Sequence, residues 1–301
     1  MLEVTSLTKT FGDKTAVDGV SFAIERPGVF GLIGTNGAGK TTTIRMILGI
    51  MCPDSGAAVW NGAPISRESL SFGYMPEERG IYMKAKVLEQ LVYFGQLRGM
   101  TKTDAAASAK RLMERLGVTE YANMTADKLS KGNQQKVQLI ATLIHDPLLL
   151  FLDEPFSGLD PVNAELLRDL ICELVEAGKY IVMSSHQMAT VEEYCDNLVL
   201  LHHGRTVLAG NLRQIKAGYG HTNLIVRVDE VAESPAAALA ADCGLALLEH
   251  RAGENEYHIT GDEMANRFLT ALIGAGIYPI RYEIKEPSLN QIFIEKVGAD
   301  Q

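Results

Sequence analysis

The sequence carries too little positive charge for a protein that coats nucleic acid. Lysine and arginine number 28 against 37 aspartates and glutamates, which gives a formal net charge of -9 at pH 7. Binding along nucleic acid works by neutralising phosphates, and that mode needs a basic face. A local basic patch is still compatible with this balance, but we expect no nucleic-acid partner.

Cysteine is scarce, and its spacing excludes the usual cysteine-based sites. The four cysteines, Cys52, Cys172, Cys195 and Cys243, lie far apart and form no C-x-x-C pair. This spacing suggests neither a zinc site nor a disulfide framework. We expect all four to be reduced and packed as small core residues.

Long hydrophobic runs are also absent. The longest strong run, Leu148 to Leu152, is far short of the ~20 apolar residues that cross a bilayer as a helix. The first residues lack the apolar stretch and small-residue cleavage site of a secretory signal. We therefore expect a cytoplasmic protein, and a membrane process would require a partner that supplies the spanning helices.

The chain is long enough for one large domain and one small one, with 301 residues and 47% hydrophobic content. Apolar and polar residues partly alternate over Leu2 to Leu7 and Val17 to Ile24, which predicts antiparallel strands at the start. Short buried strands then alternate with helices up to residue 220, a pattern typical of a parallel α/β sheet. Helical spacing over about residues 85–145 predicts a helical insert.

Residues 221–301 are expected to form a small α+β domain. The segment Gly218 to Thr222 separates them from the preceding alternation. The predicted order of strand, helix, two strands, helix and strand suits a two-layer module. Ser288 and Gln291 are spaced as in a capping box, which predicts a last helix over Leu289 to Val297.

A glycine-rich loop stands between a buried strand, Val29 to Ile33, and a helical segment. It fits the phosphate-loop pattern G-x-x-x-x-G-K-[ST] and consists of Gly34, Thr35, Asn36, Gly37, Ala38, Gly39, Lys40 and Thr41. Small residues let backbone N–H groups point at phosphate oxygens. We expect Lys40 to reach the β- and γ-phosphates of ATP and Thr41 to hold Mg²⁺, with Thr42 also in the ATP site.

Two acidic residues follow the apolar strand Leu148 to Leu152. Such a strand delivers Asp153 and Glu154 to the carboxyl edge of a parallel sheet, where ligands bind. Asp153 is suited to complete the magnesium shell, and Glu154 to polarise the attacking water. Acidic residues after a strand are common in solvated loops, so the functional interpretation depends on the phosphate loop.

Two further segments identify the kind of phosphate-loop protein that the chain resembles. The segment Leu129 to Gln135 resembles the ABC signature, and Ser157 to Asp160 resembles the D-loop of ABC ATPases. His186 follows a predicted strand, as the switch histidine of that family does. The order of these elements resembles ABC ATPases across roughly the first 220 residues. The resemblance implies a P-loop NTPase core with an antiparallel β subdomain and a helical insert.

The ABC family works as head-to-tail dimers of ATPase subunits. The resemblance implies that each ATP lies between Lys40 of one subunit and the signature residues of the other. The signature residues so implied are Ser130, Gly132 and Asn133. It also implies that Asp160 relays the state of one site to its neighbour.

The resemblance implies a family role for two further residues, and each of them also has an ordinary structural alternative. His186 would contact the γ-phosphate, and the alternative is a core or surface histidine. Phe11 resembles the A-loop aromatic that stacks on adenine, and the alternative is a core phenylalanine. Both lie where the family roles require them in the chain order.

The Q-loop region departs from the family pattern. Gly73 to Gly80 resembles this region, yet Glu77 stands where glutamine usually approaches Mg²⁺. A carboxylate can still ligate magnesium with added negative charge, so Glu77 is the expected ligand. The register leaves Glu78 as the alternative.

Three segments together resemble a prokaryotic exporter branch of sodium-extruding and bacitracin-type drug-export ATPases. They are Pro76 to Tyr82, Leu129 to Val137 and Pro287 to Ile294. The resemblance implies an ATPase subunit, as a homodimer or heterodimer, that powers a separate transmembrane permease from the inner face of the membrane. Docking is expected near Glu77 to Met83, with Arg79 and Tyr82 as contacts.

The alternatives are a soluble ABC ATPase acting on ribosomes or DNA and a regulatory binder that does not hydrolyse ATP. The single set of motifs and the acidic charge disfavour the first, and the intact motor residues disfavour the second.

Overall fold

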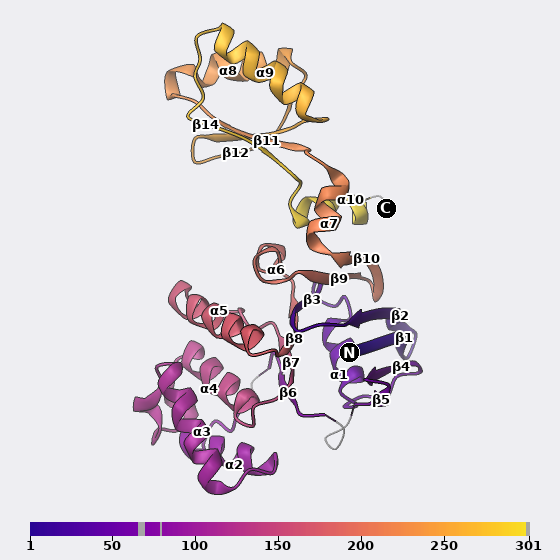
Figure 1. Cartoon of the computed structure of the whole chain (residues 1–301), viewed down its shortest axis with the longest axis vertical. Coiled ribbons are helices and arrows are strands. Elements are labelled where there is room, and N and C mark those ends of the chain that lie inside the picture. Colours follow the sequence, from indigo (N-terminus) through magenta and orange to yellow (C-terminus); the bar gives the residue numbers. More distant parts are fainter. Residues whose placement is uncertain (66–69, 79, 299–301) are drawn as a thin grey trace. The chain divides into compact units, whose positions relative to one another are not determined.

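The computed structural model describes residues 1–65, 70–78 and 80–298 and forms two compact units, Met1–Ala209 and Gly210–Gln301 (Figure 1). The division lies ahead of the boundary predicted at residue 220, because helix α7 (Leu212–Tyr219) belongs to the second unit. The Lys296 ammonium lies 5.9 Å from the centre of the Tyr219 ring, which links α7 to the last helix of that unit. No helix in these described ranges is long and apolar enough to cross a membrane.

The first unit is built on a six-stranded sheet with the strand order β10-β9-β3-β8-β7-β6. The strands are β3 (Gly28–Gly34), β6 (Phe72–Met75), β7 (Leu149–Asp153), β8 (Tyr180–Ser185), β9 (Asn197–His202) and β10 (Arg205–Asn211). Strands β9, β3, β8, β7 and β6 run parallel. The five residues of β7 are all buried, as a strand covered on both faces requires.

An antiparallel sheet of order β2-β1-β4-β5 packs beside it in the same unit. Its strands are β1 (Leu2–Phe11), β2 (Lys14–Ile24), β4 (Ser55–Trp60) and β5 (Ala63–Pro64). Phe22 of β2 stacks on Phe30 of β3 with ring centres 4.9 Å apart, and Trp60 meets Tyr180 edge-on at the same distance. The two sheets therefore share one core, and the strand pair predicted at the start is confirmed.

The helices of the first unit follow the predicted alternation. They are α1 (Lys40–Ile47), α2 (Val87–Leu97), α3 (Lys102–Arg115), α4 (Lys131–Leu143), α5 (Pro161–Glu176) and α6 (Met188–Tyr194), with short 3-10 turns η1 (Thr119–Tyr121) and η2 (Ala126–Lys128). The break at Gly99 separates α2 from α3, and Thr101 caps α3 by accepting the N–H of Asp104 at 3.1 Å. The α/β class predicted from the sequence is confirmed.

The prediction of four buried cysteines is wrong for two of them. Cys195 and Cys243 are buried, whereas Cys52 and Cys172 are exposed. The buried stripe of α5 runs through Leu167, Leu170 and Ile171, and position 172 points away from it. The prediction did not take helical periodicity into account, and this periodicity places Cys172 on the exposed side of α5.

The second unit is an antiparallel sheet of order β12-β13-β11-β14 with two helices packed on it. Its elements are β11 (Asn223–Arg227), η3 (Glu230–Ala232), α8 (Glu233–Asp242), β12 (Ala246–Arg251), β13 (Glu254–His258), α9 (Asp262–Gly274), β14 (Arg281–Lys285) and α10 (Leu289–Gly298). Leu224 and Tyr257 of the sheet pack with Ala236 of α8 and Phe268 of α9 in one core. The order of elements is the one predicted for an α+β module.

The capping box predicted before the last helix is present. The Ser288 N–H donates to Gln291 Oε1 at 2.7 Å, and the Gln291 N–H donates to Ser288 Oγ at 3.2 Å. These reciprocal bonds satisfy N–H groups that the helix itself leaves without partners.

The Phe268→Ala variant should destabilise the second unit strongly. Phe268 is fully buried, so truncation removes its packing and leaves a cavity worth about 3–5 kcal/mol of unfolding free energy. Hydrogen exchange of peptides from β11 and β13 in the full chain measures this, because Trp60 fluorescence reports only the first unit. Ile273→Ala on the same helix, at a half-exposed position, should change stability by under about 0.5 kcal/mol. Equal effects of the two variants would contradict the assigned core.

Candidate active site

Two glycines hold the loop between β3 and α1 in a shape that no other residue can adopt. Gly34 has φ 155°, and a Cβ there would lie 2.3 Å from the carbonyl oxygen of Leu201. Gly39 has φ 103°, and a Cβ there would lie 2.5 Å from the carbonyl oxygen of Ala16. The loop is therefore clamped between β9 and the start of β2, with α1 opening directly after it.

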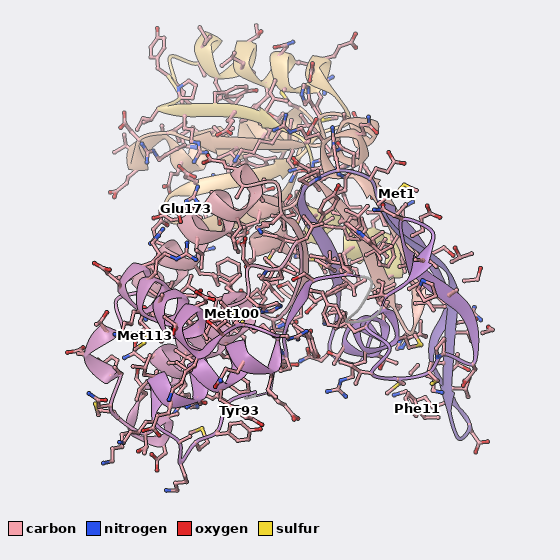
Figure 2. All side chains as sticks on the ribbon, turned by 60° about the horizontal axis from the view of Figure 1, so that its bottom comes forward. Met1, Phe11, Tyr93, Met100, Met113 and Glu173 are labelled. Atoms are coloured by element: carbon pink, nitrogen blue, oxygen red, sulfur yellow. The ribbon has the colours of Figure 1, made fainter. Side chains whose placement is uncertain are left out.

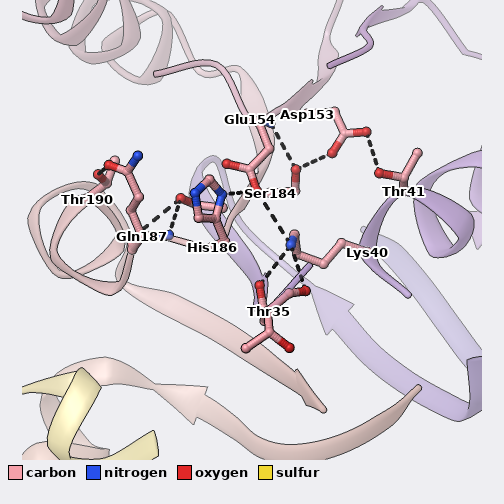
Figure 3. Close-up of polar contacts among 11 residues, drawn as sticks. Thr35, Lys40, Thr41, Asp153, Glu154, Ser184, His186, Gln187 and Thr190 are labelled. Carbon is pink, nitrogen blue, oxygen red and sulfur yellow. Dashed lines mark hydrogen bonds and ion pairs between the residues drawn. The ribbon is translucent and has the colours of Figure 1, made fainter. Parts of the chain in front are cut away.

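Lys40 points from the start of α1 back into this loop. Its Nζ donates to the carbonyl oxygens of Gly34 at 2.8 Å and Thr35 at 3.2 Å (Figure 3). The same Nζ lies 3.5 Å from Glu154 Oε1, and both side chains are about nine-tenths buried or more. The Lys40 ammonium thus joins the loop to the residue after β7.

Asp153 and Glu154 sit at that end, held by a hydroxyl on the neighbouring strand. Asp153 pairs with Ser184 in the parallel register of β7 and β8. The Ser184 hydroxyl donates to Asp153 Oδ1, and the Glu154 N–H donates to Ser184 Oγ at 3.1 Å. Ser184 was not predicted from the sequence, although its position opposite Asp153 follows once the register is known.

Glu154 has an unusual backbone. Its φ is 54°, in the left-handed region that non-glycine residues rarely adopt. Its Oε1 lies 2.9 Å from His186 Nδ1, which follows β8, and this buried oxygen accepts no hydrogen bond. A buried carboxylate oxygen whose charged neighbours, Lys40 and His186, form no hydrogen bond to it by geometry fits a group that accepts a proton from water or substrate.

A pair of oxygen donors next to the loop fits a magnesium ion. Thr41 Oγ1 donates to Asp153 Oδ2 at 2.8 Å, and the Asp153 side chain is fully buried. A hydroxyl and a carboxylate are hard oxygen ligands of the kind that Mg²⁺ prefers. The two side chains come from α1 and β7, and they meet because both elements reach the carboxyl edge of the sheet.

Glu77 is not joined to that pair. It is exposed, two residues beyond the end of β6, and no hydrogen bond or ion pair among the described residues connects it to Thr41 or Asp153. Gln138 of α4 donates to the carbonyl oxygens of Pro76 and Glu78, which holds this segment in place. Arg79, a predicted docking contact, lies outside the described residues.

Two family models match the chain. One is described as ABC transporter and matches residues 17–157, and the other is the C-terminal domain of DrrA1-3-like ATP-binding proteins and matches residues 210–297. The chain is 44% identical over 300 residues to the ABC transporter ATP-binding protein YhaQ of Bacillus subtilis, covering 99% of both chains. The chain belongs to the ABC transporter ATP-binding proteins. It is therefore an ATP-binding and ATP-hydrolysing subunit, as the resemblance of its motifs implied.

Further similarity extends to both units and to solved structures. The linearmycin resistance ATP-binding protein LnrL of Bacillus subtilis is 29% identical over 308 residues, which cover 99% of this chain and 98% of LnrL. A solved ATP-binding subunit of an ABC transporter matches with a TM-score of 0.67 and 32% identity, covering 73% of this chain and 93% of that one. The P-loop NTPase fold of the ABC cassette is thereby established.

The ABC signature forms the start of α4. Ser130 caps this helix and accepts the N–H of Asn133 at 3.3 Å. Gly132 faces Asn163 of α5, since a Cβ there would lie 3.2 Å from the Asn163 amide nitrogen. Within the described ranges, no hydrogen bond or ion pair connects Ser130, Gly132 or Asn133 to the phosphate loop.

Asp160 of the D-loop caps α5. Its carboxylate accepts the N–H of Asn163 at 2.9 Å, and this bond holds the pKa of Asp160 below its usual value. The side chain is exposed at the start of the helix. It is thus ionised and accessible on the surface that carries the signature.

Phe11 is not a core residue. It ends β1, its side chain is 48% exposed, and the Lys9 ammonium lies 5.8 Å from the ring centre (Figure 2). The adjoining β2 touches the phosphate loop through Ala16, whose carbonyl oxygen blocks any side chain at Gly39. An exposed aromatic ring on this hairpin is consistent with stacking on a base and excludes the core alternative.

The Ser184→Ala variant should impair the site through the two acids. It leaves buried Asp153 Oδ1 without a donor, which costs about 1–3 kcal/mol in unfolding free energy of the first unit. Urea unfolding followed by the fluorescence of Trp60 measures this loss, and ATPase assays should show a raised requirement for magnesium.

Ser108→Ala is the control for this variant. The Ser108 hydroxyl of α3 donates to the Ile144 carbonyl at the end of α4 at 2.8 Å, and this bond involves neither acid. Its magnesium requirement should stay unchanged. A Ser184→Ala enzyme with wild-type stability and magnesium requirement would contradict the role given to this hydroxyl.

Proposed function

We propose that the chain drives export through a separate membrane-spanning partner, with Glu154 activating water for ATP hydrolysis. The observation that carries this proposal is the convergence of Lys40, Glu154 and His186 at the phosphate loop. The carboxylate lies between the loop lysine and the histidine at 3.5 and 2.9 Å. This arrangement places a base, a cation and an imidazole around one point.

The residues divide the reaction between them. The loop N–H groups and Lys40 bind the phosphates of ATP, and Lys40 moves from the carbonyl oxygens of Gly34 and Thr35 to do so. Glu154 orients the attacking water and takes its proton. His186 holds the γ-phosphate side of the site. Phe11 stacks on the adenine, and the whole loop from Gly34 to Thr42 surrounds the phosphates.

Magnesium fits the oxygen pair of Thr41 and Asp153, with Glu77 approaching from the end of β6. When bound, Mg²⁺ neutralises negative charge on the β- and γ-phosphates. Ser184 keeps the Asp153 carboxylate oriented toward Thr41. Gln138 attaches the backbone on both sides of Glu77 to α4. The Glu77 side chain can therefore turn toward the magnesium site while this attachment is kept.

The site is completed by a second ATPase subunit. Ser130, Gly132 and Asn133 open a helix, whose N-terminal N–H groups suit a phosphate, but none of them is bonded to the loop of its own chain. A head-to-tail dimer brings them to the partner's ATP, with Asp160 at the seam. ATP binding then closes the dimer and hydrolysis reopens it.

The membrane partner docks on the aromatic cluster of Tyr82, which precedes the helical insert, and Tyr93 and Phe94 of α2, with Leu97 beside them. Tyr82 stacks on Phe94 with ring centres 5.6 Å apart, and Tyr82, Tyr93 and Leu97 are each about half exposed. Tyr93 is labelled in Figure 2. A groove beside it is lined by Pro76, Phe94, Leu97 and Gln138. Gln138 lines this groove and also bonds to the segment around Glu77. The docking surface is therefore linked to the segment expected near the ATP site.

Export and membrane location are part of the proposal. The similarity to LnrL over both units, named for linearmycin resistance, supports a substrate that is expelled. The chain would then work as a homodimer or heterodimer on the inner face of the membrane. The C-terminal domain, matched by the DrrA1-3-like model, would brace the dimer or select the partner.

The Glu154→Gln variant should bind ATP without turnover and form an ATP-stabilised dimer. Glutamine keeps the shape of Glu154 but cannot take the proton of the attacking water, so kcat should fall by at least about a hundredfold. Size-exclusion chromatography with and without ATP measures the dimer.

Two controls accompany this variant. Lys40→Ala should lose ATP binding and give no dimer, whereas Glu165→Gln, a change of an exposed acid on α5, should behave as wild type. Unchanged kcat in Glu154→Gln would rule out this residue as the base.

The Tyr82→Ala variant should weaken assembly with the membrane partner while ATP affinity stays the same. The substitution removes one ring from the half-exposed aromatic cluster and leaves the phosphate loop unchanged. Purification of the tagged chain from mild-detergent extracts of its native membranes, with the associated proteins quantified, measures assembly. Ile50→Ala, at another exposed apolar position of the first unit, is the matched control. Equal recovery of the partner in both variants would contradict the docking surface.

A further inference from the structure

The segment after Glu154 and the segment after His186 meet at two places. The first is the contact of Glu154 Oε1 with His186 Nδ1 at 2.9 Å. The second lies further along both segments, where Phe156 stacks on Tyr194 with ring centres 4.8 Å apart and planes inclined by 14°. Tyr194 is the last residue of α6, the helix that opens just after His186.

Local hydrogen bonds hold the turn after Glu154 and the turn before α6. The Ser157 N–H donates to the Glu154 carbonyl at 3.1 Å, and the Leu159 N–H donates to the Phe156 carbonyl at 3.3 Å. On the other side, the Gln187 N–H donates to Ser185 Oγ at 3.0 Å before α6 begins. These bonds limit the freedom of the backbone that joins each ring to the carboxylate or to the imidazole.

The stack is a partly buried contact of rings rather than of charges. Burial raises the pKa of Tyr194 to about 12, so its hydroxyl stays protonated at neutral pH. A separate ion pair, Arg168 with Glu193 at 3.2 Å, ties the same end of α6 to α5, but both of its side chains are more than four-tenths exposed. An exposed ion pair fixes position weakly, whereas an offset aromatic pair is favourable beyond its buried area.

We infer that Phe156 and Tyr194 are positioning residues that hold His186 against Glu154 through their ring stack. This inference rests on the proposed function, because it takes Glu154 as the base and His186 as its partner. Neither ring touches the phosphate loop in the described contacts. Their loss should slow hydrolysis and leave ATP binding intact.

A further consequence concerns the D-loop. Phe156 lies in the short loop that leads from Glu154 to Asp160, the cap of α5. A second subunit that presses on Asp160 would reach His186 through the same stack. The rings thus form a second contact between the loop that leads to Asp160 and the helix that follows His186, beside the direct contact of Glu154 with the imidazole.

The test uses four single variants of the full chain and the double leucine variant Phe156→Leu with Tyr194→Leu. Phe156→Leu and Tyr194→Leu each remove one ring, Tyr194→Phe keeps the ring and removes the hydroxyl, and Glu193→Gln removes the ion pair and keeps the stack. The measurements are kcat and KM for ATP, the affinity for a fluorescent ATP analogue, and hydrogen exchange of residues 186–194 without nucleotide. Trp60 fluorescence verifies that each variant is folded.

We expect kcat to fall by about three- to tenfold in both leucine variants, with KM and analogue affinity within about twofold of wild type. Exchange over residues 186–194 should accelerate without nucleotide, a readout independent of turnover. Tyr194→Phe keeps the ring, so its kcat and its exchange rate should match wild type. Glu193→Gln should also leave kcat and the exchange rate near wild type. The double leucine variant should be no slower than either single variant, because both changes remove one contact.

Three results would overturn the inference. The first is an unchanged kcat and exchange rate in the leucine variants, the second is a loss of activity in Tyr194→Phe equal to that of Tyr194→Leu, and the third is a fall in analogue affinity that accounts for the lower rate. Failure of the proposed function appears differently, because Glu154→Gln would then keep full ATPase activity. If Glu154→Gln is inactive and the leucine variants behave as wild type, the role of the ring stack is contradicted and the proposed function is not.

Discussion

The parallel register of β3, β8 and β7 is the constraint on which the active site depends. Ile33 pairs with Ser185 and Asp153 with Ser184, so the three strands end level at one edge. The glycine-rich loop, the two acids and His186 lie at or directly after the ends of these strands at this edge. A slip of one residue in β7 would turn Asp153 to the opposite face and separate it from Thr41.

The buried charges at this edge are stable because each has a partner. Lys40 is 6% exposed, Glu154 is also 6% exposed and Asp153 is fully buried. An isolated charge would be costly there, but Lys40 meets Glu154, and Asp153 accepts from two hydroxyls. The same contacts that stabilise the fold thus hold the lysine and the two acids together at the edge of the sheet.

The elements that form the candidate ATP site are distinct from the helical insert and from the second unit. The helical insert presents an aromatic cluster next to the Q-loop segment, and α6 connects the histidine to the loop before the D-loop. The second unit has its own core around Phe268 and its own sheet, so it folds on contacts independent of the ATP site. Changes in the partner or accessory domain can therefore occur without disturbing the register of the central strands.

The sequence by itself determined the features that depend on neighbouring residues. The glycine-rich loop, the buried strand before Asp153 and the capping box at Ser288 are local patterns, and the family resemblance followed from their order. Only the tertiary structure decided the hydroxyl link of Ser184, the stack of Phe156 on Tyr194 and the division of the chain after Ala209. These depend on pairing between strands and helices far apart in sequence, which local spacing does not encode.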